Sequence, residues 1–581
     1  MTASFLIAKL SVVAVLATYV PLFLGIGRGR QVLAAMLVVA AAMLLASSAV
    51  AAGGAATLAT ALQDRTLLVV GGLAAALALL ATLTLLAWRF PAWALPAVIA
   101  VMPLRIPLPV GERSAYLLVP LYLSTLAVLI AEVVIRDRLR PAPAGPAALP
   151  AAWHDPPDPL RLSLALFMVV AGLSVFWAGS GWGAAVLGAE WRAKVLAAGL
   201  VELLAFLLPF GIVTLLTFRY VADGAGLRRI LLTVIGGAVV MAVIGIVQYP
   251  TRWLVFNRAG IMDDYALGNG FRVNSLFWDP NMFSRFLIVA LLLSIALLVA
   301  VPVWRRRLAA ATFLLAGANL LTLSRSGWIA FAVGFVVFAF AWLGRRRGVM
   351  VAGAAVVALM AVGGLLLAAR GVNITRAKLT KPWGVNKLTG GRLYLGEAAL
   401  KMAADHPSGG VGYGVFSLAY PQYRNRHASK KLTESHTTPL TMLAELGVPG
   451  LIVFLAVVWA AFDTAFRRRR LHNPLLAAAP IRAGPGFTDS SGASACGTEV
   501  ERGAQRDASG RPVAQSDGRQ AADAHRLYLV RSGLGAALAA ILVHSLLYNA
   551  FFQDPYVWFV FGLLLATAYR LAGWHPYDRS R

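Results

Sequence analysis

Basic side chains gather between Arg370 and Ser435, in a polar segment that separates two apolar runs. Its cations are Arg370, Arg376, Lys378, Lys381, Lys387, Arg392, Lys401, Arg424, Arg426, Lys430 and Lys431, and its acids are Glu397, Asp405 and Glu434. A basic surface beside a bilayer attracts anions. Two interpretations follow: attraction to anionic lipid headgroups, or a pocket for a phosphate-bearing lipid.

This segment has the pattern of a folded loop that ends in a histidine. Leu393 to Asp405 has helical spacing, and a glycine cluster follows Pro407. At the far end, Thr438 is a good N-cap and Pro439 a good first helical residue. We therefore expect His436 to lie just before a membrane helix, at the interface.

Two other polar segments carry arginines between apolar runs. Tyr249 to Met282 contains Arg252, Arg258 and Arg272, and it ends in Trp278-Asp279-Pro280-Asn281. The second is the short turn Ser324-Arg325-Ser326-Gly327. An Arg at a helix end often extends only to the headgroups. For Arg325, contact with headgroups and a functional role are both open interpretations.

The elements that position these residues are apolar runs long enough to cross a bilayer. Of the 581 residues, 59% are hydrophobic and 13% charged, against about 25% charged in soluble domains. Runs of roughly 17–25 apolar residues must be helices in lipid. The expected spans are Phe5–Ile26, Gln31–Ala51, Thr66–Trp88, Pro91–Leu104, Tyr116–Val134, Leu162–Ala178, Val195–Phe218, Ile230–Val247, Phe283–Val303, Leu308–Leu323, Trp328–Leu343, Val349–Ala369, Pro439–Phe466, Gly533–Tyr548 and Tyr556–Leu571. The fold class is an all-α polytopic membrane protein of roughly 14–15 transmembrane helices.

The charge pattern predicts the orientation of these helices. The formal net charge is +27, but the arginines cluster between spans, which indicates cytoplasmic loops rather than nucleic-acid binding. The clusters are Arg136 to Arg140, Arg228 to Arg229, Arg305 to Arg307, Arg345 to Arg347 and Arg467 to Arg470. If these clusters are cytoplasmic, the three polar segments described above lie on the extracytoplasmic side of the cytoplasmic membrane. The single cysteine, Cys496, excludes an intrachain disulfide.

The chain divides into six parts on these grounds. Residues 1–160 hold the N-terminal membrane helices, 161–369 the core helices, 370–436 the large, partly helical extracytoplasmic loop, and 437–466 one membrane helix. Residues 467–528 are polar and rich in Gly, Ser, Ala and Pro, which predicts a disordered cytoplasmic loop. Residues 529–581 hold the last membrane helices.

Four stretches of the sequence resemble the O-antigen ligase/polymerase family of membrane glycosyltransferases. Arg272 to Ser284 resembles its Arg…Pro-Asn segment, and Leu323 to Gly327 its Ser-Arg-Ser/Gly turn. Gly391-Arg392, Asp405-His406-Pro407 and Gly410 to Gly414 resemble the start of its large outer loop, and His436 with Leu446 to Gly450 resembles the end. The family usually has Asn after the histidine, where this chain has Thr437. The likeness covers roughly residues 160–460.

The resemblance implies a metal-independent, inverting transferase of the GT-C-like kind, without cofactors. Such enzymes move a glycan from a polyprenyl (undecaprenyl) diphosphate carrier to an acceptor hydroxyl at the outer face of the cytoplasmic, or inner, membrane. The acceptor is a lipid in ligases, another glycan in polymerases, or a protein side chain. Beside these partners, membrane lipids surround the protein.

The resemblance also implies roles for six residues. The leaving diphosphate gains negative charge, which Arg272, Arg325 and Arg392 would stabilise. His436 would act as the general base or orient the acceptor. Glu397, which has Arg392 and Lys401 as candidate partners, and Asn281 would support the site.

Several alternatives stay open at this stage. His406 suits a helix-capping role, His427 a surface position, and His544 a hydrogen-bonding role inside the membrane. Asp263 and Asp264 could bind a divalent cation, but a third ligand is not evident, so no metal site is predicted. A polymerase of the same family is the nearest functional alternative.

Two rivals come from other classes of protein. A transporter of bicarbonate or of a lipid-linked glycan would place ionisable residues at mid-membrane, where Lys9 and Glu202 are the main candidates. The other rival is a non-catalytic membrane scaffold. The expected convergence of arginines disfavours the scaffold.

Overall fold

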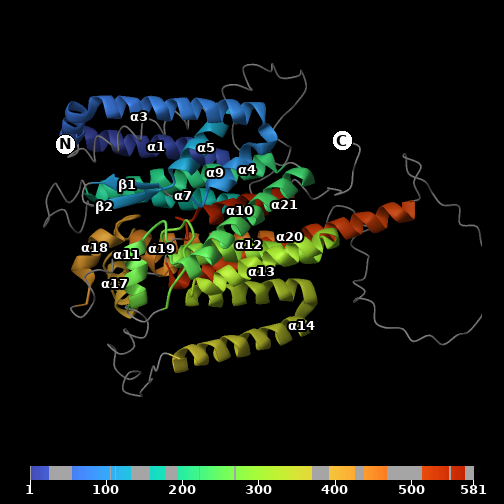
Figure 1. Cartoon of the computed structure of the whole chain (residues 1–581). Coiled ribbons are helices and arrows are strands. Elements are labelled where there is room, and N and C mark those ends of the chain that lie inside the picture. The colour runs from blue at the N-terminus through green and yellow to red at the C-terminus, as the bar shows by residue number, and fades with distance from the viewer. Residues whose placement is uncertain are drawn as a thin grey trace, which may run out of the picture.

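The computed structural model describes residues 2–24, 55–104, 106–110, 113–132, 158–177, 194–221, 223–266, 270–369, 392–425, 437–467, 513–548 and 551–569. Helices dominate these ranges (Figure 1). In chain order the elements are α1 (Thr2–Leu24), α3 (Ala55–Arg89), α4 (Pro91–Val101), β1 (Ile106–Val110), β2 (Arg113–Leu117), α5 (Val119–Ile130), α7 (Pro159–Trp177), the π-helix η4 (Leu203–Leu207), α9 (Leu208–Tyr220), α10 (Gly224–Thr251), α11 (Arg258–Ala266), α12 (Pro280–Ala300), η5 (Pro302–Trp304), α13 (Arg305–Leu321), α14 (Arg325–Ala369), α17 (Arg392–Asp405), α18 (Phe416–Tyr423), α19 (Thr438–Phe466), α20 (Val513–Leu547) and α21 (Pro555–Tyr569).

The helices confirm an all-α polytopic membrane protein. Within the described ranges, eight helices are long and apolar enough to cross a bilayer, and four shorter apolar helices accompany them. The eight are Val70–Arg89, Pro159–Trp177, Lys194–Tyr220, Gly224–Thr251, Pro280–Ala300, Arg325–Ala358, Thr438–Phe466 and Ala524–Leu547. The expected span Gln31–Ala51 lies outside the described residues, so the count of 14–15 spans stays a prediction.

Two expectations about element boundaries are wrong. The span expected at Tyr116–Val134 begins inside a hairpin, in which β1 pairs antiparallel with β2 and Ile106 lies opposite Leu117. Pro107 and Pro109 disfavour a strand assignment, yet an isolated two-stranded hairpin tolerates their missing donors. The loop expected at 467–528 is also shorter than predicted, because α20 is helical from Val513.

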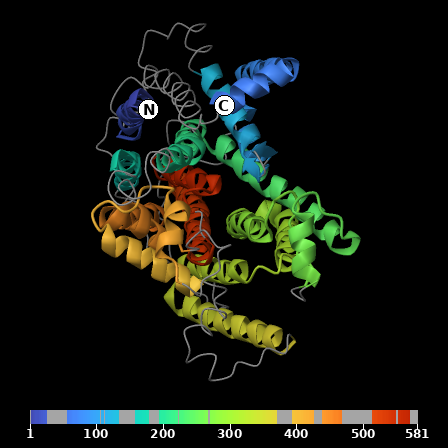
Figure 2. The ribbon, with the colours of Figure 1, turned by 90° about the vertical axis from the view of Figure 1, so that its left-hand side faces the viewer.

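Small residues hold the centre of the bundle together. The helices α12, α14 and α20 pack on one another, and Figure 2 views them from the end. A side chain at Gly334 would meet Ala540 and the main chain of Ala536 within 3 Å, and one at Gly533 would collide with Ala296. Lipid provides little hydrophobic drive between helices, so close backbone approach at such residues supplies the packing.

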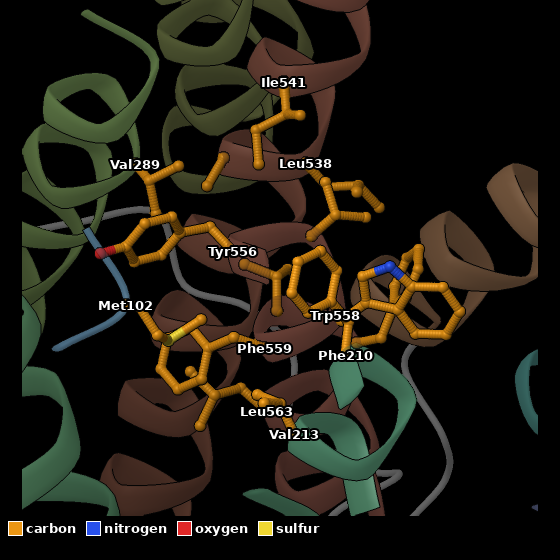
Figure 3. Close-up of a cluster of buried hydrophobic side chains, with 14 of the residues drawn as sticks. Met102, Phe210, Val213, Val289, Leu538, Ile541, Tyr556, Trp558, Phe559 and Leu563 are labelled. Atoms are coloured by element: carbon orange, nitrogen blue, oxygen red, sulfur yellow. The ribbon is translucent and has the colours of Figure 1, made fainter. Parts of the chain in front are cut away.

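A layer of large apolar side chains lies where α21 meets α9, α12 and α20 (Figure 3). Trp558 and Phe210 are fully buried there. The Trp558 carbonyl accepts a hydrogen bond from Thr214 Oγ1 at 2.7 Å, and its indole donates to Phe552 O at 2.9 Å. The first of these bonds fixes α21 against α9.

Two long helices are broken at glycines with left-handed backbone. Gly344 has φ 77° and divides α14 into two halves that fold back on each other (Figure 1). Gly447 has φ 68° and divides α19. The α17–α18 loop fills the second break: Val411 N donates to Ala444 O and Gly412 N to Glu445 O, both at 2.9 Å. Lipid cannot satisfy such groups, so the loop replaces the lost helical bonds.

The helices alternate in direction, which separates two ends of the bundle. α12 begins at Pro280, α13 returns from Arg305 to Leu321, and α14 begins again at Arg325. We call the end with the starts of α12 and α14 the site end. The opposite end, which carries Arg305 to Arg307 and Arg345 to Arg347, is the Arg-cluster end.

Candidate functional site

Arg272 is held at the site end by bonds to two neighbouring segments. Its Nε donates to Thr322 O at 3.0 Å, and its Nη2 donates to Asn281 Oδ1 at 2.8 Å. The segment that carries it is fixed by Gln248 of α10, whose Oε1 accepts from Ser275 N at 2.7 Å. The guanidinium is therefore oriented by the fold before any ligand arrives.

Arg325 and Arg392 bring two further positive charges to the same end. Arg392, the first residue of α17, donates from Nε to the Leu547 carbonyl at the end of α20 at 3.0 Å. Burial, and next the charge of Arg325, lower the pKa of Arg392 from its usual value. Arg325 is exposed at the start of α14, and it has no ion pair or hydrogen bond among the described residues. Such paired cations favour an anion beside them.

The sequence interpretation missed Arg285, which lies inside α12. Its side chain is only 4% exposed, and its Nη1 forms an ion pair with Asp554 Oδ2 at 3.3 Å. Its Nε lies 3.2 Å from Nδ1 of His544, and its Nη2 donates to Tyr548 O at 2.8 Å. An ionisable residue within an apolar run was the available signal. Its partners are more than 250 positions away in sequence, so the local pattern did not reveal them.

The other histidines and Glu397 can be compared with their expectations. His544 is buried and hydrogen-bonded, as predicted. His406 follows α17, and its Nε2 lies 3.3 Å from the Tyr423 hydroxyl. Of the two partners expected for Glu397, the structure shows Lys401, whose Nζ donates to Oε1 at 2.7 Å. Lys401, and next Asn425, lower the pKa of Glu397.

His436 lies outside the described residues, but the chain resumes beside the site. α19 begins at Thr438, one residue earlier than expected. The Thr437 hydroxyl does not cap the helix, but donates to Leu546 O at 3.3 Å, and the Thr438 hydroxyl donates to Ser545 O at the same distance. The end of α20 thus contacts both α17 and the start of α19.

The residues that the structure describes contain no group of three or more His, Cys, Asp or Glu side chains placed to hold a metal. Asp263 is exposed on α11, and the side chain of Asp264 lies outside the described residues. What the described site offers is donors and positive charge.

Comparison with known proteins adds a family to this geometry. The O-antigen ligase family model matches residues 310–455. The matched range contains Arg325, Arg392 and the part of α19 around its break at Gly447. Comparison with curated proteins gave no match. The family match supports assignment of the chain to the O-antigen ligase family. Together with the apolar helices, it supports a multi-pass membrane protein that is a glycan transferase of the ligase or polymerase kind.

Proposed function

We propose that the protein transfers a glycan from a polyprenyl-diphosphate carrier to an acceptor hydroxyl, without a metal and with inversion at the anomeric carbon. Arg272, Arg325 and Arg392 bind the diphosphate. His436 takes the acceptor proton or orients the acceptor hydroxyl. The observation that supports this proposal is that Arg392 donates to the end of α20 and lies within the field of Arg325, while Arg272 is bonded to Thr322, three positions before Arg325.

The chemistry of the leaving group supports these roles. Cleavage of the glycosyl–phosphate bond leaves additional negative charge on the diphosphate. Donors fixed in advance stabilise that charge without reorganisation. Arg272 and Arg392 are fixed by main-chain carbonyls, and the guanidinium fork matches phosphate oxygens.

The arrangement of charge supports an outward-facing site at the cytoplasmic membrane. Arg305 to Arg307 and Arg345 to Arg347 lie at the Arg-cluster end. Clusters of this kind in short loops favour the cytoplasmic side. The site end then faces outward, where lipid-linked glycans and their acceptors meet. Glu397 supports this site by fixing Lys401 on α17.

A transfer assay tests the proposal. Purified full-length protein in lipid nanodiscs is given an oligosaccharide on polyprenyl diphosphate and candidate glycan or lipid acceptors. Arg392→Ala and His436→Ala should abolish product formation, and Arg306→Ala, an exposed arginine at the Arg-cluster end, should not. Full activity of the first two variants would overturn the proposal. Transfer to a second glycan would identify a polymerase, and transfer to a lipid a ligase.

A further inference from the structure

A chain of hydrogen bonds connects the buried Arg285 to the diphosphate site. The guanidinium of Arg285 can only donate, so Nδ1 of His544, 3.2 Å from its Nε, must accept. In the neutral imidazole the proton is then on Nε2. That nitrogen lies 3.4 Å from the hydroxyl of Ser326. Arg285 therefore sets the tautomer of His544.

The direction of the chain continues through two serines. Ser326 accepts from His544, so its own proton is free for Ser324 Oγ, 3.2 Å away. Ser324 Oγ also accepts from Gly327 N at 3.2 Å, and it donates to Asn281 Oδ1 at 2.8 Å. The donor and acceptor roles of His544, Ser326 and Ser324 thus agree from one group to the next.

Asn281 is the last member of the chain, and its orientation is determined from two sides. Its Oδ1 accepts from Ser324 and also from Arg272 Nη2, both at 2.8 Å. Because an arginine cannot accept, the atom that faces Arg272 must be the oxygen. The amide nitrogen of this half-buried side chain has no acceptor among the described residues. Two N–H donors remain beside the guanidinium of Arg272.

We propose that the Asn281 amide nitrogen donates a hydrogen bond to a phosphate oxygen of the lipid-linked diphosphate. The positioning residue is Arg285, which acts through His544, Ser326 and Ser324. This inference rests on the proposed function, because it takes the diphosphate as the ligand of the site end. It adds a neutral donor to the three arginines and gives the buried Arg285 a role in orienting it.

The substitution Asn281→Asp tests the donor directly. It keeps an oxygen for Arg272 and Ser324, and it replaces the N–H donors with a negative charge. Binding of polyprenyl diphosphate to the full-length protein in nanodiscs should weaken by about tenfold or more, since hydrogen bonds to charged groups are strong. Thermal stability should stay at the wild-type value. Asn257→Asp, which adds the same charge to the same polar segment, should bind as wild type does.

The substitution Ser326→Ala tests the positioning role without removing a buried charge. It should weaken diphosphate binding severalfold in the wild-type background. In an Asn281→Ala background it should have no further effect, because the chain acts only through Asn281. A purely structural serine would weaken binding equally in both backgrounds, and that result would overturn the positioning role.

The outcomes separate this inference from the proposed function. Wild-type protein that does not bind polyprenyl diphosphate, or binds it no better than polyprenyl monophosphate, would overturn both. Wild-type protein that binds and transfers, with Asn281→Asp equal to it in binding, would overturn the inference alone.

Discussion

Arginines at the two ends of the bundle carry the same charge in different surroundings. At the site end, Arg272 and Arg392 donate to main-chain carbonyls, and Arg285 is buried in an ion pair. At the Arg-cluster end, Arg306 and Arg346 are exposed. Fixed cations can stabilise developing charge without reorganisation, whereas solvated ones must first be ordered. The surroundings of Arg272, Arg285 and Arg392 therefore distinguish them from the arginines at the other end, whereas Arg325 is exposed as those are.

The largest effect is expected from loss of the buried ion pair. Arg285→Met leaves Asp554 as an uncompensated charge, which should cost about 3 kcal/mol of the free energy of unfolding. Arg306→Met at the exposed end should cost about 0.5 kcal/mol or less. Reversible denaturation in mixed micelles measures both. Equal stability of the two variants would remove the distinction between the ends.

The next effect concerns catalysis by the exposed cation of the site. Arg325→Ala should lower the transfer rate about 100-fold, the usual cost of losing one donor to a charged transition state. Protein folding and insertion should be normal, because Arg325 is exposed. Initial rates at saturating lipid donor measure the effect, with Arg346→Ala as the matched variant. A rate for Arg325→Ala within twofold of wild type would assign Arg325 to headgroup contact instead.

Glycines at the two ends sharpen the same comparison. Gly410 has φ 64°, and a side chain there would collide with the main chain of Glu445. Gly344 has φ 77° but open space around it. Gly410→Ala should therefore lower the free energy of unfolding by about 2–3 kcal/mol. Gly344→Ala should lower it by about 1 kcal/mol, which is the cost of the backbone strain alone. Thermal unfolding of both variants gives the order, and the reverse order would contradict the tight packing of the site end.

The smallest effect is expected from the exposed pair on α17. The pKa of Glu397 is lowered, so its contribution to stability is present above its usual pKa and lost as pH falls through the folded value. Because Glu397 and Lys401 are both exposed, Glu397→Gln should lower the free energy of unfolding by only about 0.3 kcal/mol at pH 7. The difference from wild type should disappear once the pH falls below the lowered pKa of Glu397 in the folded protein. A difference that persists there would show that the carboxylate charge is not the cause.

The sequence predicted elements better than it predicted the site. Long apolar runs gave α7, α12 and α19 within a few residues, because a bilayer requires such lengths. It also predicted that Arg272, Arg325 and Arg392 belong together, through a family likeness. The sequence did not single out Arg285, because the apolar residues around an arginine do not indicate which distant residue it pairs with. Asp554 and His544 reach Arg285 only through the packing of α20 and α21 on α12.

The loop that fills the break in α19 also determines how the protein can be taken apart. Val411 and Gly412 supply N–H groups to the carbonyls at the break in α19, so the loop between α17 and α18 belongs to the same folded unit as that helix. Excised as a fragment, the loop would lose its hydrogen bonds to α19, and the carbonyls of Ala444 and Glu445 would lose the donors that the loop supplies. The hydrogen bonding of α19 at its break is complete only when the loop is in place.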